Sequence, residues 1–240
     1  TWEAIYDKKN EEFLKNPSVG KDLLRWKYQR YVKEYCRTIR SVDEQVGRLL
    51  DYLEEKGVLD NTVIVYTSDQ GFLLGEHGLY DKRFMYEESF RTPLIISCPS
   101  LVKKHSVCKE LVQNIDLAPT FLSLAGVEVP KEMSGRSLLP LFKNGKAENW
   151  RNELYYHFYD YPAVGSVRKH DGIRTKRYKL IHWHGEGSGN DEAIDFWELY
   201  DLKKDVMEVN NVYDNPKYVK VREALTVQLE KLRKDVGVTE

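Results

Sequence analysis

The segment VIVYTSDQGFLLGEHGLYDKRFMYEESFRTPLIISCP, from Val63 to Pro99, decides the fold. Its first four residues are β-branched or aromatic, the composition of a strand buried on both faces of a parallel sheet. Pro93 to Cys98 predicts a second buried strand. In open α/β sheets ligands bind beyond the carboxyl ends of the strands, where Asp69-Gln70-Gly71 falls. The loop between the two strands is therefore the candidate active site.

The start of this loop predicts a cation site. Asp69 and Gln70 offer two hard oxygen ligands side by side, which suit Ca²⁺ or Mg²⁺ better than Zn²⁺ or Cu²⁺. Two protein oxygens leave such a cation under-coordinated, so further ligands must come from elsewhere or from a bound anion. The alternative interpretation is that Asp69 only caps a turn at Gly71.

The second half of the loop adds an imidazole, His77, and two cations, Lys82 and Arg83. Two cations with a divalent metal are suited to holding a doubly charged tetrahedral ester such as sulfate or phosphate. The alternative is a solvated surface pair matched by Glu87 and Glu88. For Arg83, Glu87 and Glu88 we expect the surface interpretation.

The elements around the loop indicate an α/β fold. From Asp22 to Lys56 apolar residues recur every three or four positions, which predicts a helix closed by Gly57 at the position after its C-cap. A helix leading into a strand is a unit of an α/β sheet. Residues Asp116 to Ala125 predict a short helix with Pro119 in its first turn.

From about residue 150 the pattern changes. Four short strand-like runs predict a small antiparallel sheet, and these are Glu153–Tyr159, Ser166–Thr175, Tyr178–Trp183 and Phe196–Asp201. A final helix is expected from Pro216 to Val236, with Val219, Leu225, Leu229 and Leu232 on its apolar face. We expect Trp183 and Trp197 to pack between sheet and helix.

Composition excludes some function classes. The 240 residues carry 37 basic and 38 acidic side chains, which gives no general attraction for nucleic acid. No apolar run approaches the roughly 18 residues of a membrane span. The three cysteines lack the spacing of a disulfide framework or a metal cluster. Cys98 is expected to be a buried strand residue, Cys36 a helix-face residue and Cys108 a loop residue.

Several segments resemble the sulfatases of the alkaline phosphatase superfamily. They are Thr67–Gly71, Leu74–Gly78, Asp81–Arg83, Arg91–Ile95, Asn114–Thr120 and Gly172–Leu180, in the family's order. The resemblance implies that residues 1–149 are the C-terminal part of an alkaline-phosphatase-like α/β catalytic domain. Residues 150–240 would form a C-terminal α+β subdomain, with a small antiparallel sheet packed against a C-terminal helix.

The resemblance also implies roles for single residues. Asp69 and Gln70 would be two of the Ca²⁺ ligands, with Mg²⁺ as a possible substitute. Lys82 would bind the sulfate oxygens, and His77 would lie at the ester oxygen as a catalytic residue.

Two segments of the second part are especially similar to sulfatases that act on 6-sulfated N-acetylglucosamine. These are Tyr155–Tyr159 and Arg168–Gly172. Arg168 and His170 could hydrogen-bond sugar hydroxyls or a uronate carboxylate as substrate-binding residues. They could equally be ordinary polar residues at a hairpin edge.

The chain departs from the family at one point. Sulfatases carry near their N-terminus an Asp-Asp pair that completes the metal site, and a Cys or Ser that is oxidised to the formylglycine nucleophile. Neither motif is present here. Because the chain starts at Thr1 without a signal region, we expect it to begin inside a larger protein. The missing N-terminal part would then be its partner and would supply the formylglycine.

The sequence thus predicts part of a sulfuric ester hydrolase that removes O-sulfate from a sulfated sugar, such as 6-sulfated N-acetylglucosamine or a glycosaminoglycan. Alone, the chain is expected to be inactive. The alternatives are a phosphate or phosphonate monoester hydrolase of the same superfamily, and a non-catalytic glycan-binding fragment. By resemblance, the enzyme would be periplasmic, secreted or lysosomal.

Overall fold

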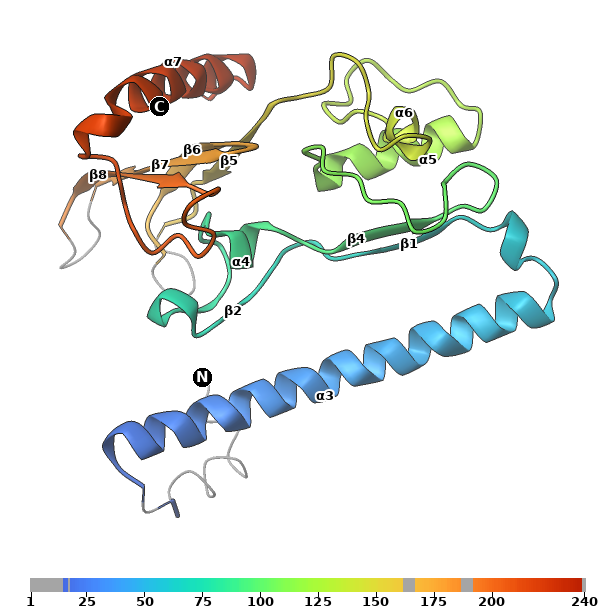
Figure 1. Cartoon of the computed structure of the whole chain (residues 1–240), viewed down its shortest axis with the longest axis horizontal. Coiled ribbons are helices and arrows are strands. Elements are labelled where there is room, and N and C mark those ends of the chain that lie inside the picture. The colour runs from blue at the N-terminus through green and yellow to red at the C-terminus, as the bar shows by residue number, and fades with distance from the viewer. Residues whose placement is uncertain (1–14, 17, 162–166, 187–191, 239–240) are drawn as a thin grey trace. The chain divides into compact units, whose positions relative to one another are not determined.

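The computed structural model describes residues 15–16, 18–161, 167–186 and 192–238 (Figure 1). Contacts group the chain into two compact units, Thr1–Leu59 and Asp60–Glu240. The domain boundary expected between residues 149 and 150 falls inside the second unit, between helix α6 (Leu139–Phe142) and strand β5 (Glu153–Phe158), and stays a prediction. Within the described residues, no helix is long and apolar enough to cross a membrane.

The described part of the first unit is mainly one long helix, α3, from Gly20 to Glu55. The prediction of a helix from Asp22 to Lys56 is confirmed, and Gly57 follows the C-cap with a φ of 65°. This positive φ is a conformation that glycine adopts without strain. No residue of α3 is buried, and Ile39 and Leu49 on the expected apolar stripe are exposed.

A short 3₁₀ turn, Leu59–Asn61, spans the boundary between the two units, and strand β1, Ile64–Thr67, follows it in the second unit. β1 pairs with β4, Leu94–Ser97, and the two strands run antiparallel. The expectation of parallel strands buried on both faces is therefore wrong for this pair. Burial alternates along β4, where Leu94 and Ile96 are partly buried while Ile95 is exposed, because only one face packs against helices.

Those helices are α5, Leu117–Leu124, and α6, Leu139–Phe142. Leu138, Leu141 and Phe142 are buried and contact the inward residues of β4 and α5. α5 agrees with the helix expected from Asp116, and a 3₁₀ turn at Asn114–Asp116 precedes it. Cys98, just after β4, is buried as expected.

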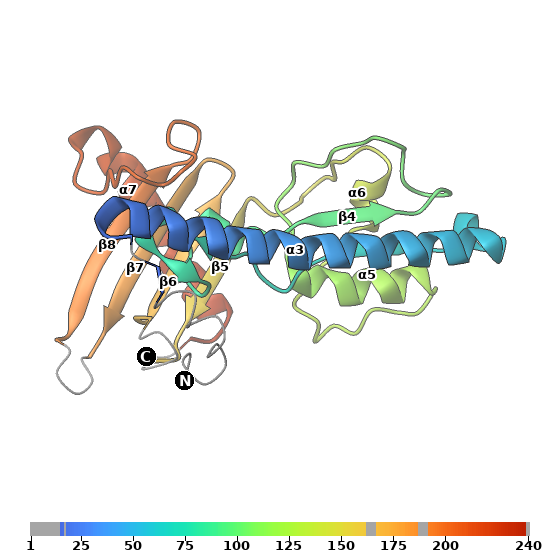
Figure 2. The ribbon, with the colours of Figure 1, turned by 90° about the horizontal axis from the view of Figure 1, so that it is seen from below.

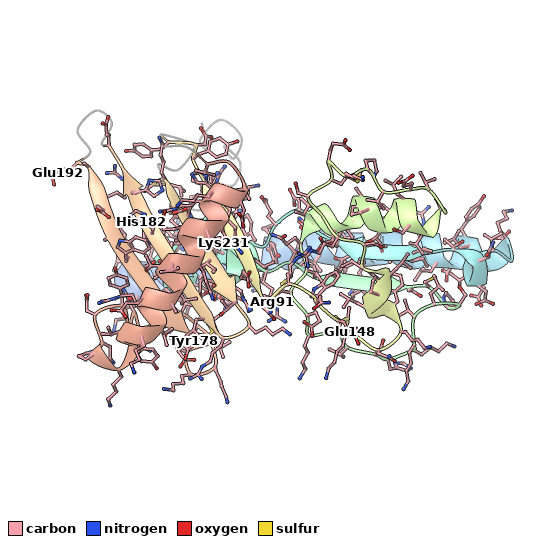
Figure 3. All side chains as sticks on the ribbon, turned by 90° about the horizontal axis from the view of Figure 1, so that it is seen from above. Arg91, Glu148, Tyr178, His182, Glu192 and Lys231 are labelled. Atoms are coloured by element: carbon pink, nitrogen blue, oxygen red, sulfur yellow. The ribbon has the colours of Figure 1, made fainter. Side chains whose placement is uncertain are left out.

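A four-stranded antiparallel sheet occupies the C-terminal part of the second unit. Its strands are β5 Glu153–Phe158, β6 His170–Thr175, β7 Tyr178–Gly185 and β8 Ile194–Asp201, paired in that order. The four predicted strands and their antiparallel pairing are confirmed, but β6 is shorter than the predicted run. Ser166 of that run lies outside the described residues, and the strand begins at His170. Helix α7, Val219–Asp235, lies across one face of the sheet after a 3₁₀ turn at Pro216–Tyr218 (Figures 1 and 3).

The core between α7 and the sheet includes Leu225 and Leu229 of the helix, with Ile173, Leu180 and Leu199 of the strands. Leu232 packs beside them as expected. Val219, however, is not in this core. Val221 takes its place one turn before Leu225, because that position keeps the helical spacing to the buried leucines.

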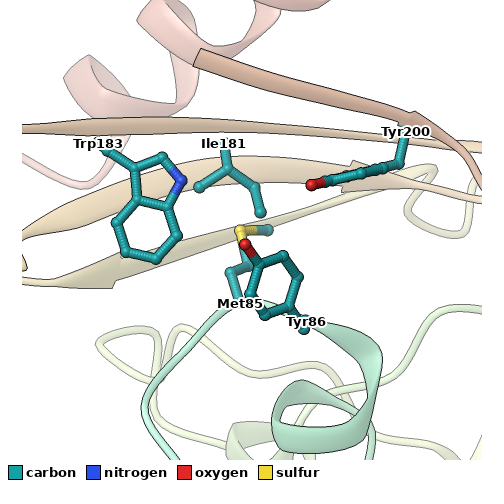
Figure 4. Packing of buried hydrophobic residues seen from close by; sticks show 5 residues of the cluster. All are labelled: Met85, Tyr86, Ile181, Trp183 and Tyr200. Atoms are coloured by element: carbon teal, nitrogen blue, oxygen red, sulfur yellow. The ribbon is translucent and has the colours of Figure 1, made fainter. Parts of the chain in front are cut away.

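The opposite face of the sheet packs against the candidate active-site loop. Met85 and Tyr86 of the loop contact Ile181, Trp183 and Tyr200 of the sheet (Figure 4). Trp183 therefore packs on the face away from α7, which corrects its expected position. Trp197 does lie on the helix side, stacked on Tyr213.

The loop itself contains three short elements before its final helix. These are β2 Leu73–Leu74, a 3₁₀ turn Glu76–Gly78 and β3 Tyr80–Asp81, with β2 and β3 paired antiparallel. The final helix, α4, runs from Glu87 to Phe90. In Figure 2, which views the ribbon from below, the loop overlaps the four-stranded sheet on which Met85 and Tyr86 pack.

Candidate active site

The peptide units after β1 are bound directly to helix α4. Gly71 N–H donates to the Ser89 carbonyl at 2.8 Å, and Phe72 N–H donates to the Glu88 carbonyl at 2.7 Å. A Cβ atom on Gly71 would overlap the Glu88 carbonyl oxygen, so this close approach requires glycine. The backbone that carries Asp69 and Gln70 is thereby fixed against α4.

A second segment holds the same strand end. The Asn114 side-chain amide donates to the Asp69 carbonyl at 2.8 Å. Asn114 itself begins the turn before α5, and the next residue but one, Asp116, is completely buried. The Asp116 carboxylate binds the Arg151 guanidinium and accepts the Gln113 and Arg136 N–H groups, both at 2.8 Å. The segment Asn114–Thr120 thus anchors the loop of Asp69.

The side chains of Asp69 and Gln70 fit a hard cation in part. Asp69 is exposed, Gln70 is half-buried, and the Ser68 hydroxyl donates to Asp69 Oδ1 at 3.2 Å. Carboxylate and amide oxygens are the donors that Ca²⁺ prefers, but it takes six to eight of them. The two residues therefore fit as part of a calcium site and not as a complete one.

His77 lies in a tight turn between two glycines. Its φ is 55°, and Gly75 and Gly78 have φ values of 121° and 71°. The ring stacks on Tyr86 with centroids 4.2 Å apart, and Nε2 lies 3.5 Å from Glu88 Oε2. The backbone of His77 is exposed, whereas its side chain is only 15% exposed. His77 and the loop of Asp69 are thus both joined to α4.

Lys82 and Arg83 differ in their surroundings. Arg83 donates to Asp81 at 2.6 Å, and its carbonyl accepts the Tyr156 hydroxyl at 2.6 Å. Burial raises the pKa of Tyr156 to about 12, so this hydroxyl stays a donor. Lys82 is half-buried and forms no hydrogen bond or ion pair with any residue that the structure describes. Its ammonium group therefore stays available for an anion.

Glu87 is not the surface residue that the sequence suggested. Its carboxylate binds Lys179 Nζ at 2.8 Å and the Arg174 guanidinium at 3.2 Å, and its N–H donates to Glu208 at 2.6 Å. Burial alone would raise the pKa of Glu87, but Lys179 and Arg174 outweigh it and lower this pKa to about 2. Glu87 therefore anchors α4 to the sheet. Glu88 also departs from the surface interpretation, because its carboxylate turns to His77.

The two proposed sugar ligands of the second part occupy different environments. Arg168 is half-buried with its guanidinium over the Tyr161 ring. His170 is completely buried and stacks on Trp183 with centroids 4.2 Å apart. Burial lowers the pKa of His170 to about 4, so the ring is neutral at pH 7. A ring enclosed in this way does not reach a sugar, so we assign His170 to packing.

A polar cluster that the sequence analysis missed lies between the sheet and α7. Asp171, His182 and His184 bring possible metal-ligand atoms within 4.8 Å of one another. The Arg233 guanidinium of α7, however, binds both Asp171 oxygens, at 2.6 and 2.5 Å, and lies 2.9 Å from His182 Nδ1. Arg233 thus holds the place that a cation would need. Residues two apart on a strand share a face, so Asp171 could have been placed on the same face as the apolar Ile173. That placement was the sequence signal for a buried polar residue there.

The fold and the matches to known families identify the class of protein. An α/β unit with this strand-end loop, followed by an antiparallel sheet and a C-terminal helix, is the alkaline-phosphatase-like fold of its structural neighbours. The Sulfatase family pattern matches residues 3–127, and the pattern described as N-sulphoglucosamine sulphohydrolase, C-terminal, matches residues 75–235. The chain belongs to the sulfatase family.

Three comparisons show which proteins the chain is similar to. An N-acetylglucosamine-6-O-sulfatase of Bacteroides thetaiotaomicron is 49% identical over 97% of this chain and 41% of its own length. The structure of BT4656 in complex with its substrate D-glucosamine-2-N,6-O-disulfate superimposes with a TM-score of 0.86 at 49% identity, covering 97% of this chain and 46% of that one. A phosphonate monoester hydrolase of Agrobacterium radiobacter is 27% identical with a TM-score of 0.67, covering 82% and 40%. The chain therefore spans less than half the length of these relatives.

Proposed function

We propose that this chain is the C-terminal part of an enzyme that hydrolyses O-sulfate esters of an aminosugar, with 6-sulfated glucosamine derivatives as the substrate class. The observation that carries the proposal is the 49% identity, over 97% of the chain, to a protein whose structure holds D-glucosamine-2-N,6-O-disulfate as its substrate. Glycosaminoglycan fragments contain such sugars and are the wider candidates.

Lys82 is the residue that we assign to the transferring sulfuryl group. It lies half-buried in the loop between β1 and α4 and forms no ion pair with a residue that the structure describes. A preorganised cation in a partly buried loop stabilises negative charge that develops on ester oxygens more than it would in water.

His77 is the residue that we assign to the leaving oxygen. Its ring is held by stacking on Tyr86 and by the approach of Glu88, so one ring nitrogen can face the substrate in a fixed orientation. A sugar alkoxide leaves poorly, and proton donation to it as the ester bond breaks is general acid catalysis.

Asp69 and Gln70 would supply two oxygens to a calcium or magnesium ion, and the upstream part of the protein would supply the other ligands and a formylglycine nucleophile. When bound, such an ion neutralises charge on the ester oxygens. The Gly71 N–H and the Asn114 side-chain amide hold the backbone of both residues at the strand end. Arg168 stays a proposed contact to the sugar. Export to the periplasm, the medium or a lysosome also stays a proposal.

The alternative is a phosphate or phosphonate monoester hydrolase. It is supported by the likeness to the Agrobacterium radiobacter enzyme, at lower identity and lower TM-score. A glycan-binding fragment without activity is the remaining alternative. Assaying the full-length protein on a 6-sulfated glucosamine, a nitrophenyl sulfate and a phosphonate monoester separates the three.

The roles of Lys82 and His77 predict different failures in the full-length protein. Lys82→Ala should cost about 2–4 kcal/mol of transition-state stabilisation with any leaving group, because Lys82 acts on the sulfuryl oxygens. His77→Ala should slow the sugar sulfate much more than nitrophenyl sulfate, since a nitrophenolate needs little protonation to leave. The measurement is kcat/KM of both variants on both substrates.

Lys104→Ala, at an exposed loop lysine, is the matched control and should match the wild type. Equal slowing of the two substrates by His77→Ala would refute the leaving-group role. Wild-type activity confined to the phosphonate ester would refute the sulfatase proposal itself.

A further inference from the structure

Glu88 stands out among the acidic residues near the site. It lies in the first turn of α4, and its side chain is only 18% exposed. Its Oε2 atom is buried and forms no hydrogen bond with any described residue. The polar group that approaches this oxygen is His77 Nε2, at 3.5 Å. A buried carboxylate oxygen without a hydrogen bond is costly, so this oxygen points to a role together with the approaching His77 ring.

The position of Glu88 is fixed from both sides. Its neighbour Glu87 is bound to Lys179 and Arg174 of the sheet, and its other neighbour, Ser89, accepts the Gly71 N–H through its carbonyl. The Glu88 carbonyl accepts the Phe72 N–H. Glu88 thus belongs to the backbone segment whose carbonyl groups bind the residues just after Asp69 and Gln70.

The His77 ring is restrained on its face as well as at its edge. Tyr86 stacks against the ring with an interplanar angle of 15°, which fixes the plane but leaves rotation within that plane. A carboxylate at Nε2 removes this remaining freedom. Tyr86 in turn donates its hydroxyl to Glu198 at 3.1 Å, so the stacking partner is itself held by the sheet.

We propose that Glu88 is a positioning residue for the leaving-group chemistry. It accepts the Nε2–H of the doubly protonated His77 ring and so leaves Nδ1–H as the donor to the ester oxygen. After that proton is transferred, His77 is the neutral ring with its remaining proton on Nε2. This inference rests on the proposed function, because it assumes that His77 serves the leaving oxygen. A distance of 3.5 Å is long for a hydrogen bond, but catalytic hydrogen bonds commonly shorten when substrate binds.

The test is a double-mutant cycle in the full-length protein with Glu88→Ala, Glu88→Gln, His77→Ala and the Glu88→Ala/His77→Ala pair. Because Glu88 acts through His77, Glu88→Ala should lower kcat on the 6-sulfated sugar about 10- to 100-fold, as loss of an orienting partner does elsewhere. KM should change little, and nitrophenyl sulfate hydrolysis should stay within about threefold. Glu88→Gln, whose amide oxygen can still accept Nε2–H, should recover most of the activity.

In the His77→Ala background, Glu88→Ala should have no further effect on either substrate. Glu223→Gln, at an exposed glutamate of α7, is the control for loss of one negative charge and should behave as the wild type. Thermal unfolding of each variant checks that the fold is kept.

Three results would overturn the inference. They are unchanged sugar-sulfate turnover in Glu88→Ala, equal slowing of both substrates, and an undiminished Glu88→Ala effect in the His77→Ala background. The proposed function has separate controls. If the wild type cleaves no sulfate ester, the function fails and this inference falls with it. If the wild type and His77→Ala behave as proposed while Glu88→Ala does not, only the role of Glu88 fails.

Discussion

At the scale of single residues, His170 is a neutral imidazole enclosed by aromatic rings. Trp183 stacks on it, and the Tyr156 and Phe158 rings lie with centroids 5.6 Å away. Its Nδ1 lies 2.8 Å from the Arg168 carbonyl, an arrangement in which the neutral ring donates Nδ1–H. Burial disfavours the charged ring, so protonating it opposes folding.

This burial predicts a pH-dependent loss of stability. The pKa of His170 is about 4 in the folded chain, against about 6.5 for an unperturbed histidine, so the unfolded state binds the proton first as the pH falls. The free energy of unfolding should therefore drop between pH 6.5 and 4, by about 2–4 kcal/mol. His170→Asn, whose amide can replace the Nδ1–H donor, should remove this part of the slope. Urea unfolding of the full-length protein at several pH values measures it.

The matched control is the same substitution at His105, a histidine with an exposed side chain. Its φ of 56° is a backbone angle that asparagine tolerates. His105→Asn should keep the wild-type pH dependence. A wild type and His170→Asn variant with parallel profiles would contradict the assignment.

Residue-level roles were the least predictable from sequence. Glu87 and Glu88 are adjacent and chemically identical, yet Glu87 enters a buried ion network and Glu88 meets His77. The partners of Glu87, Lys179 and Glu208, lie about a hundred residues away in the sequence, so no local pattern could distinguish the pair. The imidazole of His170 was likewise indistinguishable from a ligand until its burial was known.

At the scale of elements, one buried lysine joins three segments. Lys179 of β7 is fully buried, and its Nζ lies 2.8 Å from Glu87 of α4 and 2.7 Å from Glu208 of the loop after β8. Burial raises the pKa of Glu208 despite the nearby Lys179. The three buried charged groups, Lys179, Glu87 and Glu208, stabilise the fold only together, because removing one leaves an opposite charge buried without its partner.

Removing Lys179 should therefore be costly. Lys179→Ala leaves the buried carboxyl group of Glu208 without its cation and leaves Glu87 with Arg174 alone, and should destabilise the protein by about 3–5 kcal/mol. The control is Lys176→Ala, which breaks the 2.6 Å ion pair with Glu110 at a lysine side chain that is 48% exposed, and should cost about 0–1 kcal/mol. Chemical denaturation of both variants makes the comparison. Equal costs would show that the buried network contributes no more than a surface pair.

The sequence predicted the positions of helices and strands better than it predicted which strands pair and in which direction. Gly57 and the three-to-four-residue apolar spacing located the end and the extent of α3, and the turn residues of the C-terminal part located the four strands of its sheet. The direction of the β1–β4 pair was not accessible, because a continuous apolar run fits a parallel or an antiparallel neighbour equally well. The side of the sheet on which Trp183 packs depended on Met85 and Tyr86, which are distant in sequence.

At the scale of the whole molecule, apolar surface predicts association. No α3 residue is buried, Ile39 and Leu49 are 47% and 55% exposed, and Ile95 of β4 is 63% exposed. The chain covers 41% of the length of its Bacteroides relative. Exposed apolar surface and open strand edges favour self-association.

The isolated 240-residue chain should therefore self-associate, whereas co-expression with the upstream part of the protein should give a single monodisperse species. Light scattering after gel filtration measures both. Replacing Ile39 and Leu49 together by glutamate should reduce association of the isolated chain. Val227→Glu, at an exposed site on α7, should not. A monomeric isolated chain would count against the prediction.

The four-residue length of α4 has a consequence for how this protein can vary. Neighbouring residues on a helix point about 100° apart, so Glu87 and Glu88 can face two different partners only in one rotational setting. A one-residue insertion between Glu87 and Glu88 would turn one of these side chains about 100° away from its present direction, even though every residue type was kept. The length of this single helical turn therefore constrains the site as much as its residue types do.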